Sequence, residues 1–218
     1  MKIFIGSDSR HMKATRVCIQ SIKNNSKKSD HKIMFLDKAK LKNIGVYGRD
    51  DVKGESTEFS FTRFYVPLLC NYEGIAMFCD NDFLWKCNPK EIEKYLDGKS
   101  IAVVKHKYYE PIKEKMDGVV NKNYPRKNWS SLILFDCSKL KQLSKDFLDS
   151  ASPAALHQFE WLVDSEIAEI PRSYNHLVGH YKKHNKIKAL HYTNGGPWFD
   201  EYKNSELSEE WWKVYETL

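Results

Sequence analysis

Residues 75–85 read Ile-Ala-Met-Phe-Cys-Asp-Asn-Asp-Phe-Leu-Trp, an unbroken apolar run that leads into two aspartates. A run of this length is typical of a strand buried on both faces of a sheet. At the end of an extended strand, Asp80 and Asp82 point to one side and Asn81 points away. Two carboxylates between apolar stretches are costly without a cation, and hard divalent cations prefer oxygen ligands. The pair predicts a metal site at a strand end; the alternative is a turn in which both aspartates bind backbone amides.

The length of 218 residues suits one large domain, and no linker, repeat or low-complexity tract divides the chain. We therefore expect a single domain over residues 1–218. The net charge of +6, from 35 basic and 29 acidic residues, fits a partner that carries phosphate. The lysines are scattered rather than gathered in a basic arm, so nucleic-acid binding is not expected.

The cysteines are odd in number and show no C-x-x-C spacing, which predicts reduced thiols and a cytoplasmic protein. The apolar N-terminus, residues 1–5, is too short for a signal peptide. No stretch approaches the roughly 20 apolar residues of a membrane span, so none is expected.

Strands and helices alternate at the start of the chain. Residues 2–6 and 32–36 read as strands, and the apolar spacing between them predicts a helix with Ser9 as its N-cap. This order predicts an α/β fold, a Rossmann-like domain with a mostly parallel central sheet flanked by helices. Ligands bind at the carboxyl ends of such strands, so Ser7, Asp8 and Ser9 are site candidates by position; the alternative is turn and cap chemistry.

The remaining pattern predicts further elements and one conflict. Pro67 falls inside a predicted helix, where proline costs about 3 kcal/mol. Residues 107–128 are polar, aromatic and irregular, and a connection of that length usually has a function. Strands are expected at 100–104, 131–135 and 187–190, and helices at 61–71, 89–96, 138–148 (capped by Ser138), 154–163 and after a cap at Ser208.

Four separated segments resemble the nucleotide-sugar-dependent glycosyltransferases of the GT-A fold, close to glycosyltransferase family 8, the galactosyltransferase and glycogenin group. Their order and spacing carry the resemblance over most of the chain, and the family tolerates a proline at position 67. The same motifs resemble the small transferase domains of chlorella viruses, which would imply a viral protein in the host cytoplasm. The segments are residues 6–9 (GSDS), 61–69 (FTRFYVPLL) with 78–82 (FCDND), 128–133 (NWSSLI) and 191–198 (HYTNGGPW).

The resemblance implies a UDP-sugar donor and a divalent cation held by Asp80, Asp82 and His191. Such a cation stabilises the negative charge that grows on the leaving diphosphate. A mixed oxygen and nitrogen ligand set favours Mn²⁺, with Mg²⁺ as the alternative. From the residues alone, a histidine at a strand end such as His191 is more often structural than a metal ligand, and only the resemblance reverses that preference.

The resemblance also implies roles for other residues. Arg63 would brace the metal aspartates and take part in catalysis, and Asp8 with its neighbours would meet the base and ribose. Tyr192 and Trp198 would line the diphosphate and sugar pocket, unless they are packing anchors. The full set of donor-binding candidates is Gly6, Ser7, Asp8, Ser9, Arg63, Asp80, Asn81, Asp82, His191, Asn194, Gly195, Gly196 and Trp198.

Two positions depart from the family pattern. Gly196 stands where the family has a lysine that touches the diphosphate, so this contact is either missing or made by another residue, for instance Lys203. The family's Asp-Gln pair beside the acceptor matches His157-Gln158, so Gln158 is a catalytic candidate without its aspartate. Candidates for a catalytic carboxylate by region are Asp136, which we place in the site, and Glu160 and Asp164.

These patterns predict a metal-dependent hexosyl- or deoxyhexosyltransferase that moves a sugar from a UDP-sugar to a glycan, a glycoprotein or another hydroxyl acceptor. One alternative is a haloacid-dehalogenase-like phosphatase with Asp80 as nucleophile. That motif prefers Thr or Val where this chain has Leu84, and it usually follows the first strand. The other alternative is a non-catalytic, metal-dependent sugar-binding module.

Overall fold

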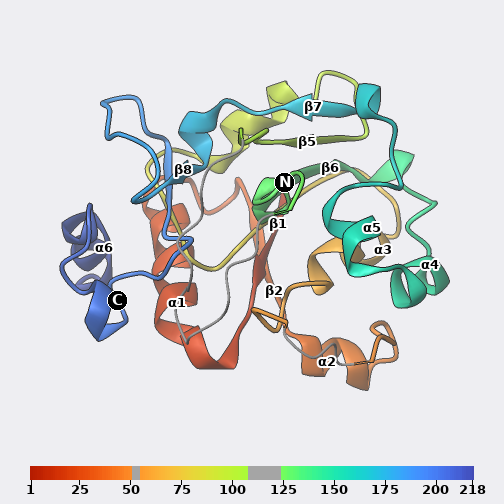
Figure 1. Cartoon of the computed structure of the whole chain (residues 1–218), viewed down its shortest axis with the longest axis horizontal. Helices are drawn as coiled ribbons and strands as arrows, with labels where there is room; N and C mark the ends of the chain where they lie inside the picture. The colour runs from red at the N-terminus through yellow and green to blue at the C-terminus, as the bar shows by residue number, and fades with distance from the viewer. Residues whose placement is uncertain (51–54, 108–123) are drawn as a thin grey trace.

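A computed structural model describes residues 1–50, 55–107 and 124–218 of the chain. Its centre is a twisted sheet with helices on both sides (Figure 1). Two helices lie on one side, α1 (Met12–Asn24) and α6 (Ser208–Tyr215). The other side carries α3 (Val66–Leu69), α4 (Lys145–Ser150) and α5 (Pro153–His157), with α2 (Lys38–Asn43) below them in Figure 1.

The central sheet has six strands in the order β2-β1-β3-β6-β5-β7. Only the two pairings of β6 are antiparallel, so the expected mostly parallel α/β sheet is confirmed. Five of its strands match the predicted apolar runs closely, while β7 was not predicted. The strands are β1 (Lys2–Gly6), β2 (Lys32–Leu36), β3 (Ile75–Cys79), β5 (Ile101–Val103), β6 (Leu132–Asp136) and β7 (Ile167–Glu169).

Both faces of the central strands are buried, which explains the unbroken apolar runs. In β3, Met77 packs in the core on the α1 side and Phe78 in the core on the opposite side. The neighbouring β1 repeats the alternation with Ile3 and Phe4. A strand covered on both faces cannot show a polar alternation, because neither face meets water.

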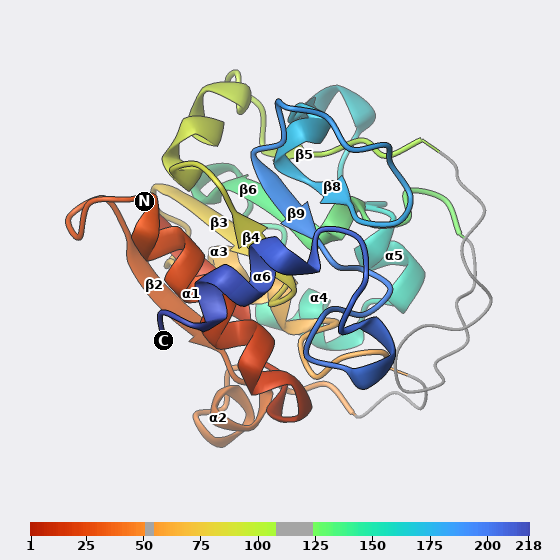
Figure 2. The same ribbon diagram turned by 90° about the vertical axis from the view of Figure 1, so that its left-hand side faces the viewer.

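A second, three-stranded sheet has the order β4-β9-β8 and lies in front of the first in Figure 2. Its strands are β4 (Phe83–Trp85), β8 (His176–Leu177) and β9 (Ala189–His191). The strand expected at residues 187–190 is thus displaced toward His191. Residues 80–82 form the passage from β3 of the first sheet to β4 of the second, so the acidic pair lies where the two sheets meet.

Pro67 creates no conflict in the structure. The expected helix over 61–71 is a short 3₁₀ helix, Thr62–Tyr65, followed by α3. Pro67 lies in the first turn of α3, where an amide hydrogen is not needed within the helix.

Three predicted helix starts or lengths were wrong. Ser138 does not cap a helix: the side chain of Asp136 caps a 3₁₀ turn there, and Ser144 caps α4. Ser208 lies inside α6 and makes no cap hydrogen bond. The helix expected over 154–163 ends at His157, because Phe159 adopts a left-handed φ of 55° that no helix continues.

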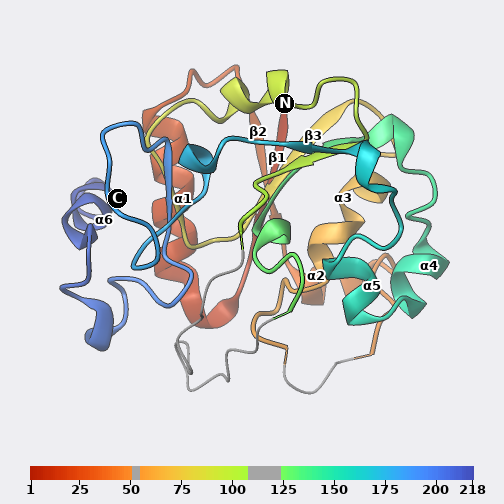
Figure 3. The ribbon, with the colours of Figure 1, turned by 45° about the horizontal axis from the view of Figure 1, so that its top comes forward.

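Ser9 is likewise not the N-cap: Asp8 accepts the amide of Arg10, and α1 begins only at Met12. Asn88 does cap the following segment, as predicted, but that segment is a 3₁₀ helix, Pro89–Tyr95. Figure 3 shows the helices from a tilted viewpoint, with α1 and α6 grouped apart from α3, α4 and α5.

Most of the irregular segment over residues 107–128 lies outside the described residues. Within the described parts, no helix has both the length and the apolar character needed to cross a bilayer. All five cysteines are free and buried, as reduced thiols require: Cys18, Cys70, Cys79, Cys87 and Cys137.

Candidate functional site

The two aspartates are fixed by the backbone around them. The amide of Asp80 donates to the carbonyl of Ser131 at 2.9 Å, which continues the β3–β6 ladder one step past the strand. The side chain of Asn81 points toward α1, where its amide group donates to Thr15 Oγ1 at 3.1 Å. Asn81 therefore faces away from the carboxylates, as the two-residue spacing predicts.

Strand pairing brings His191 to the acidic pair. In the β4–β9 ladder, His191 lies opposite Phe83, and the amide of Tyr192 donates to the carbonyl of Asp82 at 3.1 Å. The imidazole stacks on the Phe83 ring at 4.5 Å, and its Nε2 lies 3.3 Å from Asp82 Oδ1. One ligand atom from each of Asp80, Asp82 and His191 lies within 4.8 Å of the others.

A buried hydrogen-bond chain fixes the tautomer of His191. Ser131 Oγ donates its proton to the carbonyl of Asn128 at 2.7 Å and so accepts from Asn175 Nδ2 at 2.9 Å. The Asn175 amide is thereby oriented with Oδ1 toward His191 Nδ1, 2.9 Å away. Nδ1 therefore carries the proton, and the lone pair of Nε2 faces Asp82.

This arrangement fits a metal ion. An imidazole lone pair and a carboxylate oxygen that face each other at 3.3 Å repel unless a proton or a metal ion lies between them. Two carboxylates and one neutral imidazole are a common donor set for first-row divalent ions. A metal-ligating histidine usually donates its other ring N–H to a fixed acceptor, as His191 does to Asn175.

Arg63 braces the site from behind, as expected. Its Nη1 lies 2.9 Å from Asp80 Oδ1 and donates to the carbonyl of Ser130 at 2.8 Å. Its Nε donates to the carbonyl of Phe59, and its guanidinium stacks over the ring of Phe78 at 4.8 Å. With 5% exposure, Arg63 is held rigidly and offsets the charge of Asp80.

A cavity of about 120 Å³ adjoins this cluster. The predicted residues that line it are Arg63, Asp80, Asn81, Asp82 and His191. Hydroxyl, amide and aromatic groups that were not predicted as site residues complete the wall, among them Thr57, Ser60, Asn128, Ser130 and Thr193. The wall is polar and surrounds the two carboxylates, as a site for a phosphorylated or hydroxylated ligand requires.

His157 lines the same cavity. Its Nδ1 pairs with Ser130 Oγ at 2.9 Å, and its ring meets Phe64 edge-on at 5.2 Å. Burial, assisted by the positive charges of Arg63 and Arg49, lowers the pKa of His157 to about 3, so the imidazole is neutral at ordinary pH. A neutral ring thus stands where the resembled family has a carboxylate.

Gln158 and Asp136 are not brought to this cavity. The backbone carbonyl of Gln158 accepts from Arg126 at 2.8 Å, and Gln158 is not among the described residues of the wall. Asp136 pairs with Ile75 at the far end of the β3–β6 ladder, and its carboxylate binds Ser138. At about 3.3 Å per strand residue, this places Asp136 roughly 16 Å from Asp80.

The other two acidic candidates also lie elsewhere. Glu160 is exposed, and Asp164 forms an ion pair with Arg126 at 2.5 Å. Apart from Asp80 and Asp82, no described carboxylate lines the cavity.

The N-terminal motif is tied to the cavity wall. A side chain at Gly6 would meet the ring of Phe59 at 2.4 Å, so only glycine allows β1 to end against this wall residue. Burial alone would raise the pKa of Asp8, but hydrogen bonds from Arg10 and from the amide of Glu58 outweigh it and lower this pKa. Ser9 Oγ donates to Glu58, and the amide of Ser7 donates to Leu36.

Most residues of the C-terminal motif, 191–198, pack in the protein interior rather than line the cavity. A side chain at Gly196 would lie 2.0 Å from the Trp198 ring, and Trp198 in turn packs at 5.7 Å on Trp211. Tyr192 is buried and donates its hydroxyl to Leu207, as a packing anchor does.

Asn194 pairs with His180, and a side chain at Gly195 would meet the Tyr202 ring. The backbone carbonyl of Lys203 accepts from Trp212 Nε1. From this motif, only His191 and Thr193 line the cavity among the described residues.

Sequence reasoning missed Asn175, Ser130 and Ser131 as site residues. The two serines lie in a segment that carried the resemblance, so they had a signal that was not used. Asn175 had none, because it precedes a two-residue strand in a stretch without periodicity.

Comparison with known structures identifies the fold. The chain is similar to the glycosyltransferase GlyE of Streptococcus pneumoniae TIGR4, with a TM-score of 0.66 and 14% identity over 98% of this chain and 60% of the GlyE chain. It is also similar to the galactosyltransferase LgtC, solved with donor and acceptor sugar analogs, with a TM-score of 0.62 and 10% identity over 100% of this chain and 96% of that one. The chain therefore has the GT-A glycosyltransferase fold, although it spans only about 60% of the GlyE chain.

No protein-family model matches the chain. The viral origin and the membership in family 8 expected from the motifs stay predictions. Protein CDI of Arabidopsis thaliana is 43% identical in an alignment that covers 96% of this chain and 84% of that protein. At this identity and coverage, the chain belongs to the same protein family as Arabidopsis Protein CDI.

Proposed function

We propose that this chain is a metal-dependent glycosyltransferase that moves a hexosyl or deoxyhexosyl group from a UDP-sugar to a hydroxyl of a glycan or glycoprotein. The observation that carries the proposal is the meeting of Asp80, Asp82 and His191 within 4.8 Å beside a polar cavity, at the carboxyl end of a central strand. The GT-A fold supports it, because ligands of open α/β sheets bind at that end.

Asp80, Asp82 and His191 would hold the cation, Mn²⁺ or alternatively Mg²⁺. When bound, such an ion stabilises negative charge on the departing diphosphate. Arg63 keeps the Asp80 carboxylate in place and fixes the end of β6 through the Ser130 carbonyl. Asn175 keeps Nε2 of His191 available as a lone pair.

The rest of the wall would position the donor. The nucleoside would bind at the carboxyl end of β1 and the segment around Phe59, which Gly6 and Asp8 join. His157 and Ser130 offer uncharged hydrogen-bonding groups for sugar hydroxyls. Asn194, Gly195, Gly196 and Trp198 would act by shaping the loop that carries His191, while Gln158 and Asp136 stay predictions without support from their placement.

The two alternatives fit less well. A dehalogenase-like nucleophile must be free to attack, whereas Asp80 is ion-paired with Arg63 and close to His191. A non-catalytic sugar-binding module shares every feature of the site, so only turnover separates it from a transferase.

The test measures UDP release from a panel of UDP-hexoses with Mn²⁺, Mg²⁺ or a chelator, together with UDP binding by calorimetry. We expect metal-dependent UDP release that Asp80→Asn abolishes and the matched Asp97→Asn, at an exposed position outside the cavity wall, leaves unchanged. Metal-dependent UDP binding without release from any donor would instead favour the binding module. Phosphate release from a phosphomonoester, lost in Asp80→Asn, would favour the phosphatase.

A further inference from the structure

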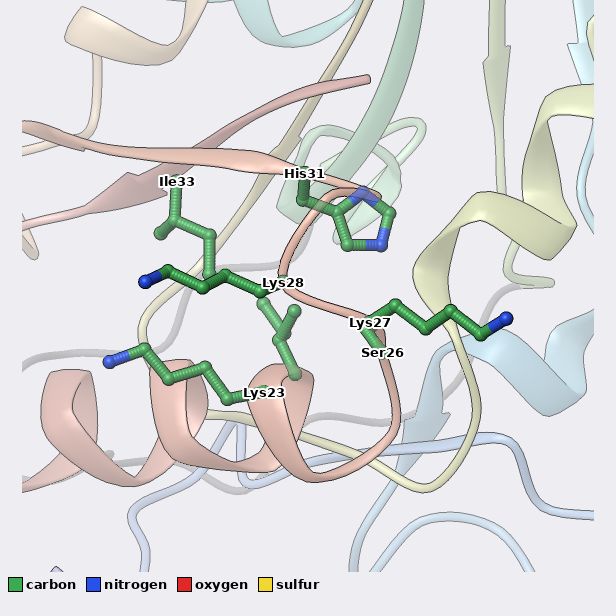
Figure 4. Close-up of a pocket in the computed structure, with 7 residues that line it drawn as sticks. Lys23, Ser26, Lys27, Lys28, His31 and Ile33 are labelled. Carbon is green, nitrogen blue, oxygen red and sulfur yellow. The ribbon is translucent and has the colours of Figure 1, made fainter.

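Two neighbouring hollows lie between α1 and the edge strand β2, away from the acidic cluster. The first measures about 510 Å³ and is lined by Lys23, Ser26, Lys27, Lys28, His31 and Ile33 (Figure 4). It lies at the amino end of β2, whereas the candidate active site lies at the carboxyl end of β3. The second, of about 400 Å³, shares Lys23 and Ile33 with the first and extends the surface to Arg16, Phe35 and Leu218.

The floor of this surface is apolar and exposed. Phe35 is 52% exposed and Leu218 is 42% exposed, and both line the second hollow. Phe35 and Ile33 are two apart on β2, so both face the α1 side of the sheet. Figure 2 shows the C-terminus beside α1 and β2, so these apolar groups belong to one surface.

The rim of the surface is basic. Lys23 and Lys28 extend side by side past Ile33 in Figure 4, while Lys27 points the other way. Among the described residues, no acidic side chain forms an ion pair with Arg16, Lys23 or Lys28. Asp30, the acidic residue of the same turn, is used by the amide of Lys27 and by Asn88.

We propose that this basic apolar face, formed by Arg16, Lys23, Lys28, Ile33, Phe35 and Leu218, docks the protein onto membranes that contain anionic phospholipids. An apolar centre with lysine and arginine around it matches the interface of such a membrane, where rings and aliphatic groups enter the headgroup layer and cations meet phosphate. Ser26 lines the first hollow, and among the described residues its buried hydroxyl has no hydrogen-bond partner.

Charge decides between this occupant and a second copy of the chain. A symmetric dimer through the basic apolar face would bring its three cations against the same three of the partner, which is unfavourable. An anionic bilayer instead complements every one of them. Because the active-site cavity lies at the other end of the strands, docking through this face leaves it open to substrate.

The test is co-sedimentation of the whole chain with vesicles of phosphatidylcholine alone or mixed with phosphatidylserine, at low and high salt. We expect binding only to the mixed vesicles, weakened by salt. Lys23→Glu with Lys28→Glu should weaken it at least 20-fold, at about fivefold per cation removed. Phe35→Ser should weaken it without changing the salt dependence. The matched control, Lys40→Glu with Lys141→Glu, changes the net charge equally on exposed positions elsewhere and should have little effect.

Several outcomes would overturn the proposal. If the Lys23/Lys28 variant and the control variant lose vesicle binding equally, the binding depends only on net charge. If the chain binds neutral vesicles equally well, the cations have no role. If the chain binds neither vesicle but binds inorganic phosphate through Lys23 and Lys28, the face is a site for a soluble anion. If it binds neither vesicle but self-associates in sedimentation velocity, the face is an interface with a second copy. Thermal melts confirm that each variant is folded, and this control does not depend on the proposed activity.

Discussion

Asn175 offers the sharpest test of the proposed metal site, because it touches the proposed ligand His191 but not the position of the ion itself. It is fully buried, and its amide links Ser131 Oγ to His191 Nδ1 by two hydrogen bonds of 2.9 Å. Asn175→Ala removes the acceptor that keeps the proton on Nδ1, so Nε2 is no longer held as a lone pair toward Asp82. Loss of such an outer partner typically weakens metal binding 10- to 100-fold, or about 1.4–2.8 kcal/mol.

The substitution also destabilises the metal-free protein, so stability alone is not informative. A buried donor left without its partner costs about 1–3 kcal/mol, and His191 Nδ1 becomes such a donor. Asn175→Asp separates the two effects, because a carboxylate oxygen still accepts from Nδ1 and the carboxylate–histidine–metal arrangement is common. We therefore expect Asn175→Asp to keep Mn²⁺ affinity within a few-fold of the natural chain.

The assay is calorimetric titration with Mn²⁺, combined with thermal melts with and without the ion. The prediction requires that Asn175→Ala loses affinity and that Asn175→Asp regains it. If Asn175→Ala lowers the melting temperature but binds Mn²⁺ as well as the natural chain does, the hydrogen-bond chain is only structural. If both variants lose affinity equally, the tautomer argument is refuted.

Three further outcomes are expected. Asp80→Ala or Asp82→Ala should abolish Mn²⁺-dependent UDP binding in calorimetry without unfolding the chain, and His191→Ala should narrow the preference for Mn²⁺ over Mg²⁺ because nitrogen favours the softer ion; unchanged binding in all three would remove the metal site. In thermal shift with Mn²⁺, UDP should stabilise the protein more than GDP or CMP does, and the reverse order would contradict a uridine donor. Burial lowers the pKa values of His106 and His157 to about 3. In the unfolded chain the imidazole pKa is about 6.5, so between about pH 3 and pH 6.5 the unfolded chain binds more protons than the folded one. Stability should thus be lost as the pH falls through this window, by up to about 1.4 kcal/mol per pH unit for each ring, and His157→Gln should flatten the dependence of unfolding free energy on pH; an identical slope in that variant would show that His157 is not buried neutral.

The long buried strands could be predicted because their apolar runs depend only on burial of both faces. β1 and β2 have the predicted bounds, and β3 was recognised from its apolar run together with the acidic pair that follows. In the second sheet, β9 was predicted with displaced bounds, whereas β4 and β8 were not predicted, because two or three residues carry too little pattern to distinguish a strand from a loop. The metal aspartates follow from local spacing, whereas His191 was identified only by resemblance, since β4–β9 pairing brings it in from far along the chain.

Helix starts show the same limit. Asp8 and Ser9 are both good caps by type, and the choice depends on Arg10 and Glu58, which bind Asp8 in the folded chain. The chemistry of Asn175 was equally invisible, because its role comes from Ser131 and His191 on two other strands.

The passage of residues 80–82 between the two sheets has a mechanical consequence. Asp80 extends the end of the six-stranded sheet, while Asp82 and His191 belong to the three-stranded one. A bound ion would therefore add a cross-link to the chain connections, hydrogen bonds and packing that already join the two sheets, and it would cost more to pull β9 away from β3. Chelation should then accelerate amide hydrogen exchange in β8 and β9 far more than in β1 and β2, so the metal would set the local unfolding energy of one sheet and leave the other almost untouched.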